Sequence, residues 1–194
     1  ISQNEFDLRA YGAIGDGRTS NTEAFRKAIE AAAAEGGRVI VPNGIWLTGP
    51  IRILSNTELH LEDNAVILFD KNQDEYPLII TDFEGITRIR ARSPIYAENA
   101  ENIAITGNGI INGNGHLWRP VKQFKMTARQ WKELLGKSPY VLESKEGGIW
   151  FPARSMFDTA IAGEIFPGDY ASYEEALAAA SPHYDFYRPV MVSL

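Results

Sequence analysis

The chain has 194 residues, 44% of them hydrophobic and 23% charged, with a formal net charge of -6 and no cysteine. This composition is typical of one globular domain with a sizeable core. The negative charge argues against nucleic acid as a partner, since phosphate binding needs an excess of Lys and Arg. No apolar run approaches the length of about 18 residues that predicts a membrane span, so we expect no membrane partner. The lack of cysteine excludes disulfides and thiol chemistry.

The N-terminal segment ISQNEFDLRAYG has no basic stretch followed by an apolar one. We therefore expect a signal peptide to be absent or already removed. The next segment, YGAIGDGRTSNTEAF (residues 11–25), is rich in glycine but lacks the Lys-Ser or Lys-Thr pair of a phosphate loop. Its Asp16 has no second carboxylate at a metal-ligand spacing. We predict a turn without a ligand.

The first strong element is a helix over residues 21–35, where apolar residues recur with helical period. Ser20 and Glu23 have the spacing of a capping box, and Gly36 and Gly37 end the pattern.

Short segments with period two follow, separated by Gly, Asn and Pro. They repeat: Val39, Val41, Gly44, Trp46 and Leu47 shift by 20 onto Leu59, Leu61, Asn64, Val66 and Ile67, and these shift by 44 onto Ile103, Ile105, Asn108, Ile110 and Ile111. A repeat of about 20 residues built from strands and turns is typical of a β-solenoid, with Asn or Gly at left-handed corners. A β-sandwich is the alternative. The helix would cap the end of the solenoid.

We predict one domain of the all-β solenoid class: an N-terminal cap at 1–37, first coils at 38–115, a long, partly helical insertion at 116–188, and the start of the next coil at 189–194. In the insertion, Thr127 with Gln130 and Ser172 with Glu175 have capping-box spacing. The segment GGIWFPARSMF between them reads as irregular.

The sequence from FDLRAYGAIGDG to NAVILF, together with SPIYAENAENIAITGNGIINGNG and YRPVMV, resembles the N-terminal part of the family-28 glycoside hydrolases, the polygalacturonases and their relatives. The resemblance implies a right-handed parallel β-helix with an N-terminal capping α-helix. It also implies a secreted or periplasmic bacterial pectin hydrolase. The glycine-aspartate opening is similar as well to phage tailspikes and other pectate-lyase-like β-helices.

The resemblance implies an Asn-Thr-Asp motif, an Asp-Asp pair, a Gly-His-Gly and an Arg-x-Lys on later coils. One Asp would protonate the leaving oxygen while the others activate water, giving inversion. No two aspartates of this chain are adjacent, and His116 is followed by Leu117. We therefore expect no catalytic residue here, and no activity from this chain alone. Because Leu194 falls within a strand pattern, we expect the remaining C-terminal β-helix or a partner to cover an open coil.

Candidate binding residues gather in the insertion, whose first part, residues 116–145, has a net charge of +5. This excess suits an acidic plant polysaccharide, namely pectin, homogalacturonan or rhamnogalacturonan fragments. A solvated surface is the alternative, and for Trp118 core packing is an even alternative. The substrate-binding candidates are His116, Trp118 and Arg119 after a strand end, with Trp150 and Arg154 in a second aromatic-basic cluster. The insertion would shape one end of the groove and favour exo-action.

The remaining candidates point to structure. Arg88, Arg90 and Arg92 alternate and are expected on one exposed strand face, His60 faces outward from a strand, and His183 lies in a loop. The three histidines lack ligand spacing, so we expect no metal, and no cofactor motif is present. The functional alternatives are a non-hydrolytic carbohydrate-binding or tailspike-like β-helix and an inactive truncated scaffold.

Overall fold

The computed structural model describes residues 4–194, which form two compact units. Unit 1 contains residues 4–76, 92–114 and 190–194, and unit 2 contains residues 77–91 and 115–189. Each unit has its own hydrophobic core.

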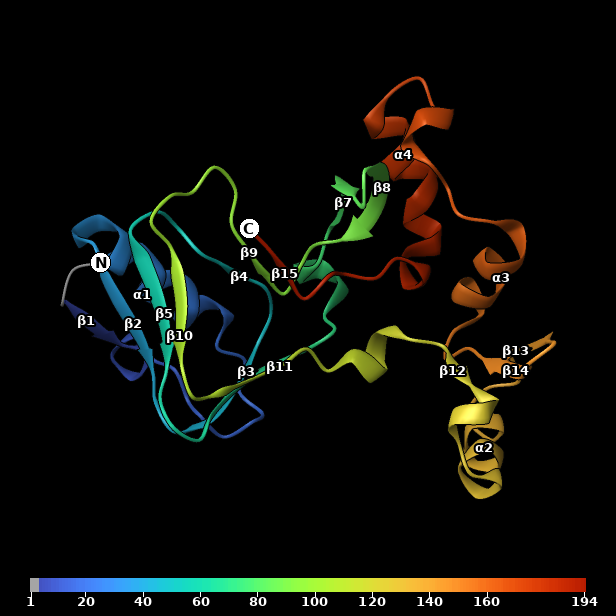
Figure 1. Ribbon diagram of the computed structural model, residues 1–194, viewed down its shortest axis with the longest axis horizontal. Helices are drawn as coiled ribbons and strands as arrows, with labels where there is room; N and C mark the ends of the chain where they lie inside the picture. Colours follow the sequence, from blue (N-terminus) through green and yellow to red (C-terminus); the bar gives the residue numbers. More distant parts are fainter. Residues whose placement is uncertain (1–3) are drawn as a thin grey trace. The chain divides into compact units, whose positions relative to one another are not determined.

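Unit 1 is a stack of coils in which each turn of the chain adds one strand to each of three parallel sheets (Figure 1). The first sheet contains β1 (Glu5–Asp7), β2 (Gly37–Val41), β5 (Thr57–Leu61) and β10 (Ala104–Gly107). The second contains β3 (Gly44–Thr48), β6 (Ala65–Phe69) and β11 (Ile110–Asn112), and the third contains β4 (Ile51–Arg52), β9 (Ile95–Tyr96) and β15 (Val192–Ser193). The prediction of a parallel β-helix is confirmed for this unit, whereas the all-β class is right only in part, because the described residues also form the helices α1 to α4.

The coils are held together by inward side chains that stack from one turn to the next. Val39 pairs in register with Leu59, and Trp46 with Ile67; all four are at most 2% exposed. Burial of such side chains is the main source of stability in a parallel sheet covered on its inner face.

Between the first two coils, the predicted shift of 20 is right for the first sheet and one residue wrong for the second. Val39 does shift by 20 onto Leu59, but Trp46 pairs with Ile67 and not with Val66. The corner between β5 and β6 has one more residue than the corner between β2 and β3. A slip of one residue along the strand would turn every side chain to the opposite face. The extra residue is therefore placed in the corner, and Ile67 keeps its inward position.

The third coil also departs from the predicted shift of 44. Leu59 pairs with Ile105, two residues beyond the predicted Ile103, whereas Ile67 pairs with Ile111 as predicted. A shorter corner at Asn108 and Gly109 compensates. The side chains of Ile105 and Ile111 therefore still point toward the core of unit 1.

Asparagines occupy left-handed corners of the coils, as predicted for Asn64, whose φ is 62°. Asn56 and Asn102 have φ values of 61° and 56° in successive coils, and the Asn102 side-chain amide donates to Asn56 Oδ1 at 2.9 Å. Asn tolerates this conformation better than other side-chain-bearing residues, and the amides hydrogen-bond along the stack.

Helix α1 (Thr22–Glu35) is present as predicted and contributes Phe25, Ala28 and Ile29 to the core of unit 1. Its apolar face packs on β1, β2 and β4. This arrangement confirms the predicted N-terminal cap.

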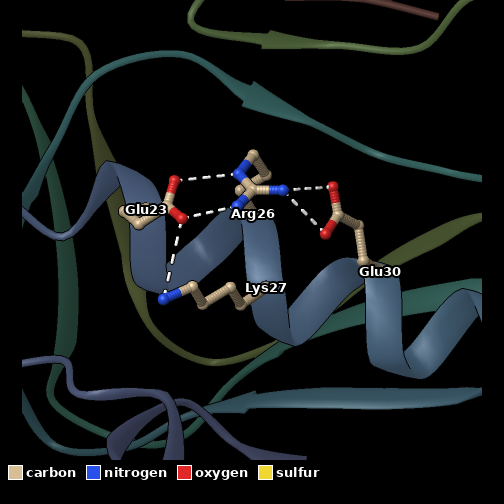
Figure 2. Close-up of polar contacts among 4 residues, drawn as sticks. All are labelled: Glu23, Arg26, Lys27 and Glu30. Carbon is tan, nitrogen blue, oxygen red and sulfur yellow. Dashed lines mark hydrogen bonds and ion pairs between the residues drawn. The ribbon is translucent and has the colours of Figure 1, made fainter.

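The capping box predicted at Ser20 and Glu23 is wrong. Asn21 is the N-cap residue, and Glu23 accepts hydrogen bonds from Arg26 and pairs with Lys27 along the exposed helix surface, while Arg26 also binds Glu30 (Figure 2). With Asn21 as the N-cap, Glu23 is the second residue of the helix and not the third, so the spacing of a capping box is not met.

The polar residues of the glycine-rich segment are used for turns, as predicted. Asp16 accepts hydrogen bonds from the amides of Arg18 and Thr19, both at 2.8 Å. The hydrogen bonds from the Thr19 amide, the Arg18 amide and the Thr19 hydroxyl lower the pKa of Asp16. Gly17 donates to the Ile45 carbonyl at 2.7 Å, which holds the segment along β3.

Unit 2 begins with a hairpin that the repeat pattern did not predict. Strands β7 (Leu78–Phe83) and β8 (Ile86–Ala91) pair antiparallel, so the expected coil range 38–115 is interrupted between β6 and β9. Glu84 and Gly85 both have positive φ, which is the signature of a two-residue hairpin turn. Ile89 on β8 packs with Ala176, Ala180 and Tyr187.

Arg88, Arg90 and Arg92 are not the exposed row that was predicted. Arg88 binds Glu164 at 2.8 Å, and the Arg90 guanidinium lies 3.6 Å from the centre of the Phe83 ring. Arg92 follows the hairpin and pairs with Glu98 in unit 1. Each guanidinium has a partner within its own unit.

The insertion contains a three-stranded antiparallel sheet ordered β12 (Val121–Lys122), β14 (Gly147–Trp150) and β13 (Val141–Ser144). Three helices accompany it: α2 (Ala128–Leu135), α3 (Arg154–Ala162) and α4 (Tyr173–Ala180). The segment expected to be irregular thus forms β14 and the start of α3. Short 3-10 turns complete the chain: η1 (Leu8–Tyr11), η2 (Gln73–Glu75), η3 (Gly115–Trp118), η4 (Gln123–Lys125), η5 (Pro167–Asp169) and η6 (Ser181–Phe186).

Both helix starts predicted in the insertion are present. Thr127 and Gln130 exchange hydrogen bonds as a complete capping box, with Thr127 N donating to Gln130 Oε1 at 3.0 Å. Ser172 accepts from the Glu175 amide at 3.2 Å.

Asn21 links the glycine-rich segment to the first coil and should be a main stabiliser of the cap. It is 2% exposed, its amide donates to the carbonyls of Ile14, Thr19 and Leu47, and its oxygen accepts from the Ile14 amide at 2.7 Å. We expect Asn21→Ala to lower the local unfolding free energy by about 2–4 kcal/mol, because buried polar groups lose their partners. Hydrogen exchange of residues 37–48 measures this.

Ser20→Ala is the matched control, and it should change the same quantity by less than about 0.5 kcal/mol because Ser20 is exposed. A larger effect from Ser20 than from Asn21 would contradict this account of the cap.

Candidate functional site

The most suitable site for a ligand is a pocket of about 730 Å³ within unit 2. Its walls come from η3, the β12–β14–β13 sheet, helix α3 and the segment that ends the insertion. Thirteen residues line it: Gly115, His116, Arg119, Pro120, Val121, Lys122, Lys125, Leu142, Ile149, Phe151, Ala160, Phe186 and Arg188.

One face of the antiparallel sheet contributes to the wall of this pocket. Ile149 on the central strand is paired in register with Lys122 on one side and with Leu142 on the other. Directly paired residues of an antiparallel sheet share a face, so these three side chains lie together. All three line the pocket.

The opposite face packs on helix α2. A Cβ at Gly148 would lie 2.9 Å from the Trp131 ring, so the indole rests directly on the strand backbone. Trp150 is two residues after Gly148 on β14, so its side chain points to the same face as Gly148, the face that packs on α2.

The basic side chains of the pocket are exposed, and no acidic side chain lines it. The cationic or titratable members are His116, Arg119, Lys122, Lys125 and Arg188. Such an arrangement attracts an anion, and Arg is the side chain best suited to bind a carboxylate through two parallel hydrogen bonds.

The Arg119 guanidinium lies against the backbone of Gly115, where an added Cβ would meet Arg119 Nη2 at 2.7 Å. The glycine therefore leaves room for the guanidinium beside η3. Any side chain at position 115 would displace it.

The positive charges near the pocket include arginines of the β7–β8 hairpin. Burial is the first cause that lowers the pKa of Arg90, and repulsion from Arg88 and Arg188 adds to it, while Glu164 and Glu84 oppose it. Arg188 thus lies close enough to other guanidinium groups to feel their charge. A bound anion near Arg188 would relieve this repulsion.

Two of the five predicted site residues, His116 and Arg119, come together in this pocket. Trp118 is 3% exposed and packs against Tyr184 with ring centres 6.5 Å apart, which matches the core-packing alternative. Trp150 is 7% exposed, and its indole N–H donates to the Ser138 carbonyl at 3.1 Å. Arg154 pairs with Asp158 and is not among the lining residues. Binding roles for all five stay predictions.

Sequence reasoning missed Arg188 and the apolar side chains of the pocket. A topological signal for Arg188 was available: an insertion must return near the point where it leaves, so its last residues come back toward its first. The apolar lining has no comparable signal, because it depends on the pairing of short strands.

Other features of the described residues fit a ligand less well. A smaller cavity in unit 1 is lined by His60, Glu62, Asp63 and Asn108, and its acidic groups would repel an anion. His60 faces outward as predicted, and its Nδ1 lies 2.7 Å from Thr106 Oγ1. His183 lies in the 3-10 helix η6 and not in the predicted loop, and its Nδ1 lies 2.7 Å from Thr159 Oγ1.

Residues 4–194 contain no cluster of three or more metal-ligating His, Asp or Glu side chains. Within the same range, no helix has the length and apolar character needed to cross a membrane.

Similarity to known proteins covers part of the chain. It is 37% identical over 117 residues to the exo-poly-α-D-galacturonosidase of Dickeya chrysanthemi, covering 56% of this chain and 19% of that protein. It is 36% identical over 118 residues to a probable polygalacturonase of Vitis vinifera, covering 56% of this chain and 24% of that protein. The chain thus spans about a fifth to a quarter of the length of these curated relatives.

Solved structures agree with this relationship. A hyperthermoactive exopolygalacturonase from Thermotoga maritima superposes with a TM-score of 0.56 at 37% identity, over 71% of this chain and 34% of that one. The family 28 exopolygalacturonase of Yersinia enterocolitica gives a TM-score of 0.59 over 99% of this chain and 32% of that one; its 23% identity supports the fold alone. The chain is therefore partially homologous to family-28 polygalacturonases.

Shorter matches reach proteins of other kinds. The chain is 40% identical over 88 residues to plasmin and fibronectin-binding protein A of Streptococcus pneumoniae and 42% identical over 72 residues to a pre-neck appendage protein of Bacillus phage B103. These matches cover 12% and 8% of those proteins. No family model matches the sequence.

Proposed function

We propose that this chain is the N-terminal part of a pectin-degrading glycoside hydrolase that cleaves galacturonosyl or related linkages with inversion. The observation that carries the proposal is the 37% identity over 117 residues to an exo-poly-α-D-galacturonosidase. We also propose that the β-helix of unit 1 winds in the right-handed sense.

The catalytic aspartates would lie on coils beyond those described above. Inversion needs two carboxyl groups about 6.5–9.5 Å apart, with room for a water between the second one and the sugar. Strands β10, β11 and β15 form sheet edges, and Ile110 and Leu194 are 60% and 69% exposed. Further coils or a partner would cover these edges.

In this proposal the pocket of unit 2 binds a carboxylate of the acidic polysaccharide. Arg119 and Arg188 supply the guanidinium groups, and the absence of acidic lining side chains favours a polyanion. A binding pocket on an insertion would hold one end of the polymer and so favour exo-action. Action on such a polymer suits a secreted or periplasmic protein.

A non-hydrolytic carbohydrate-binding β-helix is the second candidate. The similarity to a plasmin and fibronectin-binding protein and to a phage appendage protein favours a role without hydrolysis, and the carbohydrate ligand is part of the proposal. It would share the scaffold and the cationic pocket with the hydrolase but lack the catalytic pair.

Replacing both pocket arginines should weaken the binding of digalacturonate. We expect Arg119→Ala with Arg188→Ala to raise its Kd at least about tenfold, as two charge-assisted contacts are lost, and the wild-type affinity to fall with added salt. Isothermal titration calorimetry on the full chain measures both effects.

Arg129→Ala is the control, since Arg129 is 90% exposed and pairs with Glu133 on α2, away from the pocket residues. Its Kd should stay within about twofold of the wild type. Equal weakening by the control, or no binding of digalacturonate by the wild type, would contradict the assignment of the pocket.

The isolated 194 residues should release no reducing ends from polygalacturonate, whereas a longer protein that contains the following coils should. Turnover by the isolated chain would refute the placement of the catalytic residues. Binding without turnover by the longer protein would favour the second candidate.

A further inference from the structure

The pocket of unit 2 is half apolar, and a bare uronate sugar does not explain this. Its apolar lining residues are mostly half-buried, whereas its cations are exposed; the apolar ones are Val121, Leu142, Ile149, Phe151, Ala160 and Phe186. A galacturonate ring carries hydroxyl groups all around its edge. Its C–H faces can pack on one apolar wall, but hydroxyl groups that meet the further apolar walls would lose hydrogen bonds to water without replacing them.

The size of the pocket indicates a ligand larger than one sugar ring. Its volume of about 730 Å³ falls in the range of sites that bind drug-sized ligands and cofactors. Such sites combine apolar walls with a few polar groups that fix orientation, which is the division between walls and cations found here.

Two rings of the wall are held in place by other rings. Phe151 packs edge-to-face against Phe157 with centroids 5.7 Å apart, and Phe186 packs in the same manner against Tyr187 at 5.5 Å. Each of these wall residues is thus already packed against a neighbouring ring in a favourable geometry. An aromatic group of a ligand can therefore pack on Phe151 and Phe186 while these two side chains lose little further conformational freedom, which favours binding.

We propose that this pocket binds a carboxylate that also carries an aromatic group, as in a uronate sugar esterified with a hydroxycinnamic acid. The aromatic group lies against Leu142, Ile149, Phe151 and Phe186, and the carboxylate faces Arg119 and Arg188. The inference rests on the proposed function for the sugar part of the ligand. The combination of an apolar ring and an anion rests on the pocket alone.

The experiment compares three small probes by calorimetry on the full chain: 4-hydroxycinnamate, its uncharged methyl ester, and galacturonate. 4-Hydroxycinnamate should bind at least about tenfold more tightly than either of the others, because only it supplies both the ring and the charge. Equal or tighter binding of galacturonate would overturn the inference and leave the proposed function intact.

Leu142→Ala tests the apolar wall, and it should weaken 4-hydroxycinnamate about fivefold or more, and by a larger factor than it weakens digalacturonate, because the aromatic ring depends more on apolar contact than the sugar does. Leu135→Ala is the control, because Leu135 is 43% exposed on α2 and does not line the pocket. If Leu142→Ala does not fold, Ala160→Leu serves instead, since a larger side chain from α3 would fill the pocket and should block 4-hydroxycinnamate.

The outcomes separate the inference from the proposed function. Binding of 4-hydroxycinnamate with no binding of digalacturonate and no activity in the longer protein would refute the proposed function and uphold the chemistry of the pocket. Binding only to vesicles of anionic phospholipid, with neither small carboxylate competing, would overturn the inference. No effect of Leu142→Ala or Ala160→Leu on 4-hydroxycinnamate would overturn it as well.

Discussion

The stacking of inward side chains between coils is the constraint on which the rest of unit 1 depends. Val39, Leu59 and Ile105 follow one another through the first sheet, and Trp46, Ile67 and Ile111 through the second. Because a slip of one residue would expose a whole strand face, differences in length are confined to the corners. The corners therefore contain the asparagines with left-handed backbone conformation, and they are also where the hairpin and the insertion leave the coil.

Both departures occur at the same step of the coil, after the second sheet and before the third. In the first coil β3 connects to β4 through Gly49 and Pro50 alone, whereas in the second the hairpin intervenes between β6 and β9, and in the third the insertion intervenes between β11 and β15. The two excursions together make unit 2. The regular coils thus stabilise unit 1, and the candidate pocket lies on the expanded corners, where changes in sequence do not disturb the stack.

Much of unit 1 could be predicted from the sequence because its signals are local and repeated. Apolar alternation gave the coils, and the stripe on Phe25, Ala28 and Ile29 gave the capping helix. The register of the second sheet could not be predicted, since it depends on corner length. In the insertion, residue type suggested Trp118 and Trp150 as binding groups, but type reveals neither that Trp118 packs against Tyr184 nor which face of the sheet Trp150 occupies. Pairing of β12, β14 and β13 decides that, and it also creates the apolar wall of the pocket.

The account is tested most directly by hydrogen exchange of the full chain with and without trigalacturonate. It predicts protection at residues 115–125, 142–151 and 186–188, which contain twelve of the thirteen lining residues, and no change at the acidic cavity around His60 and Asn108. Protection confined to the outer faces of the unit 1 sheets, or absent from the pocket at saturating ligand, would contradict it.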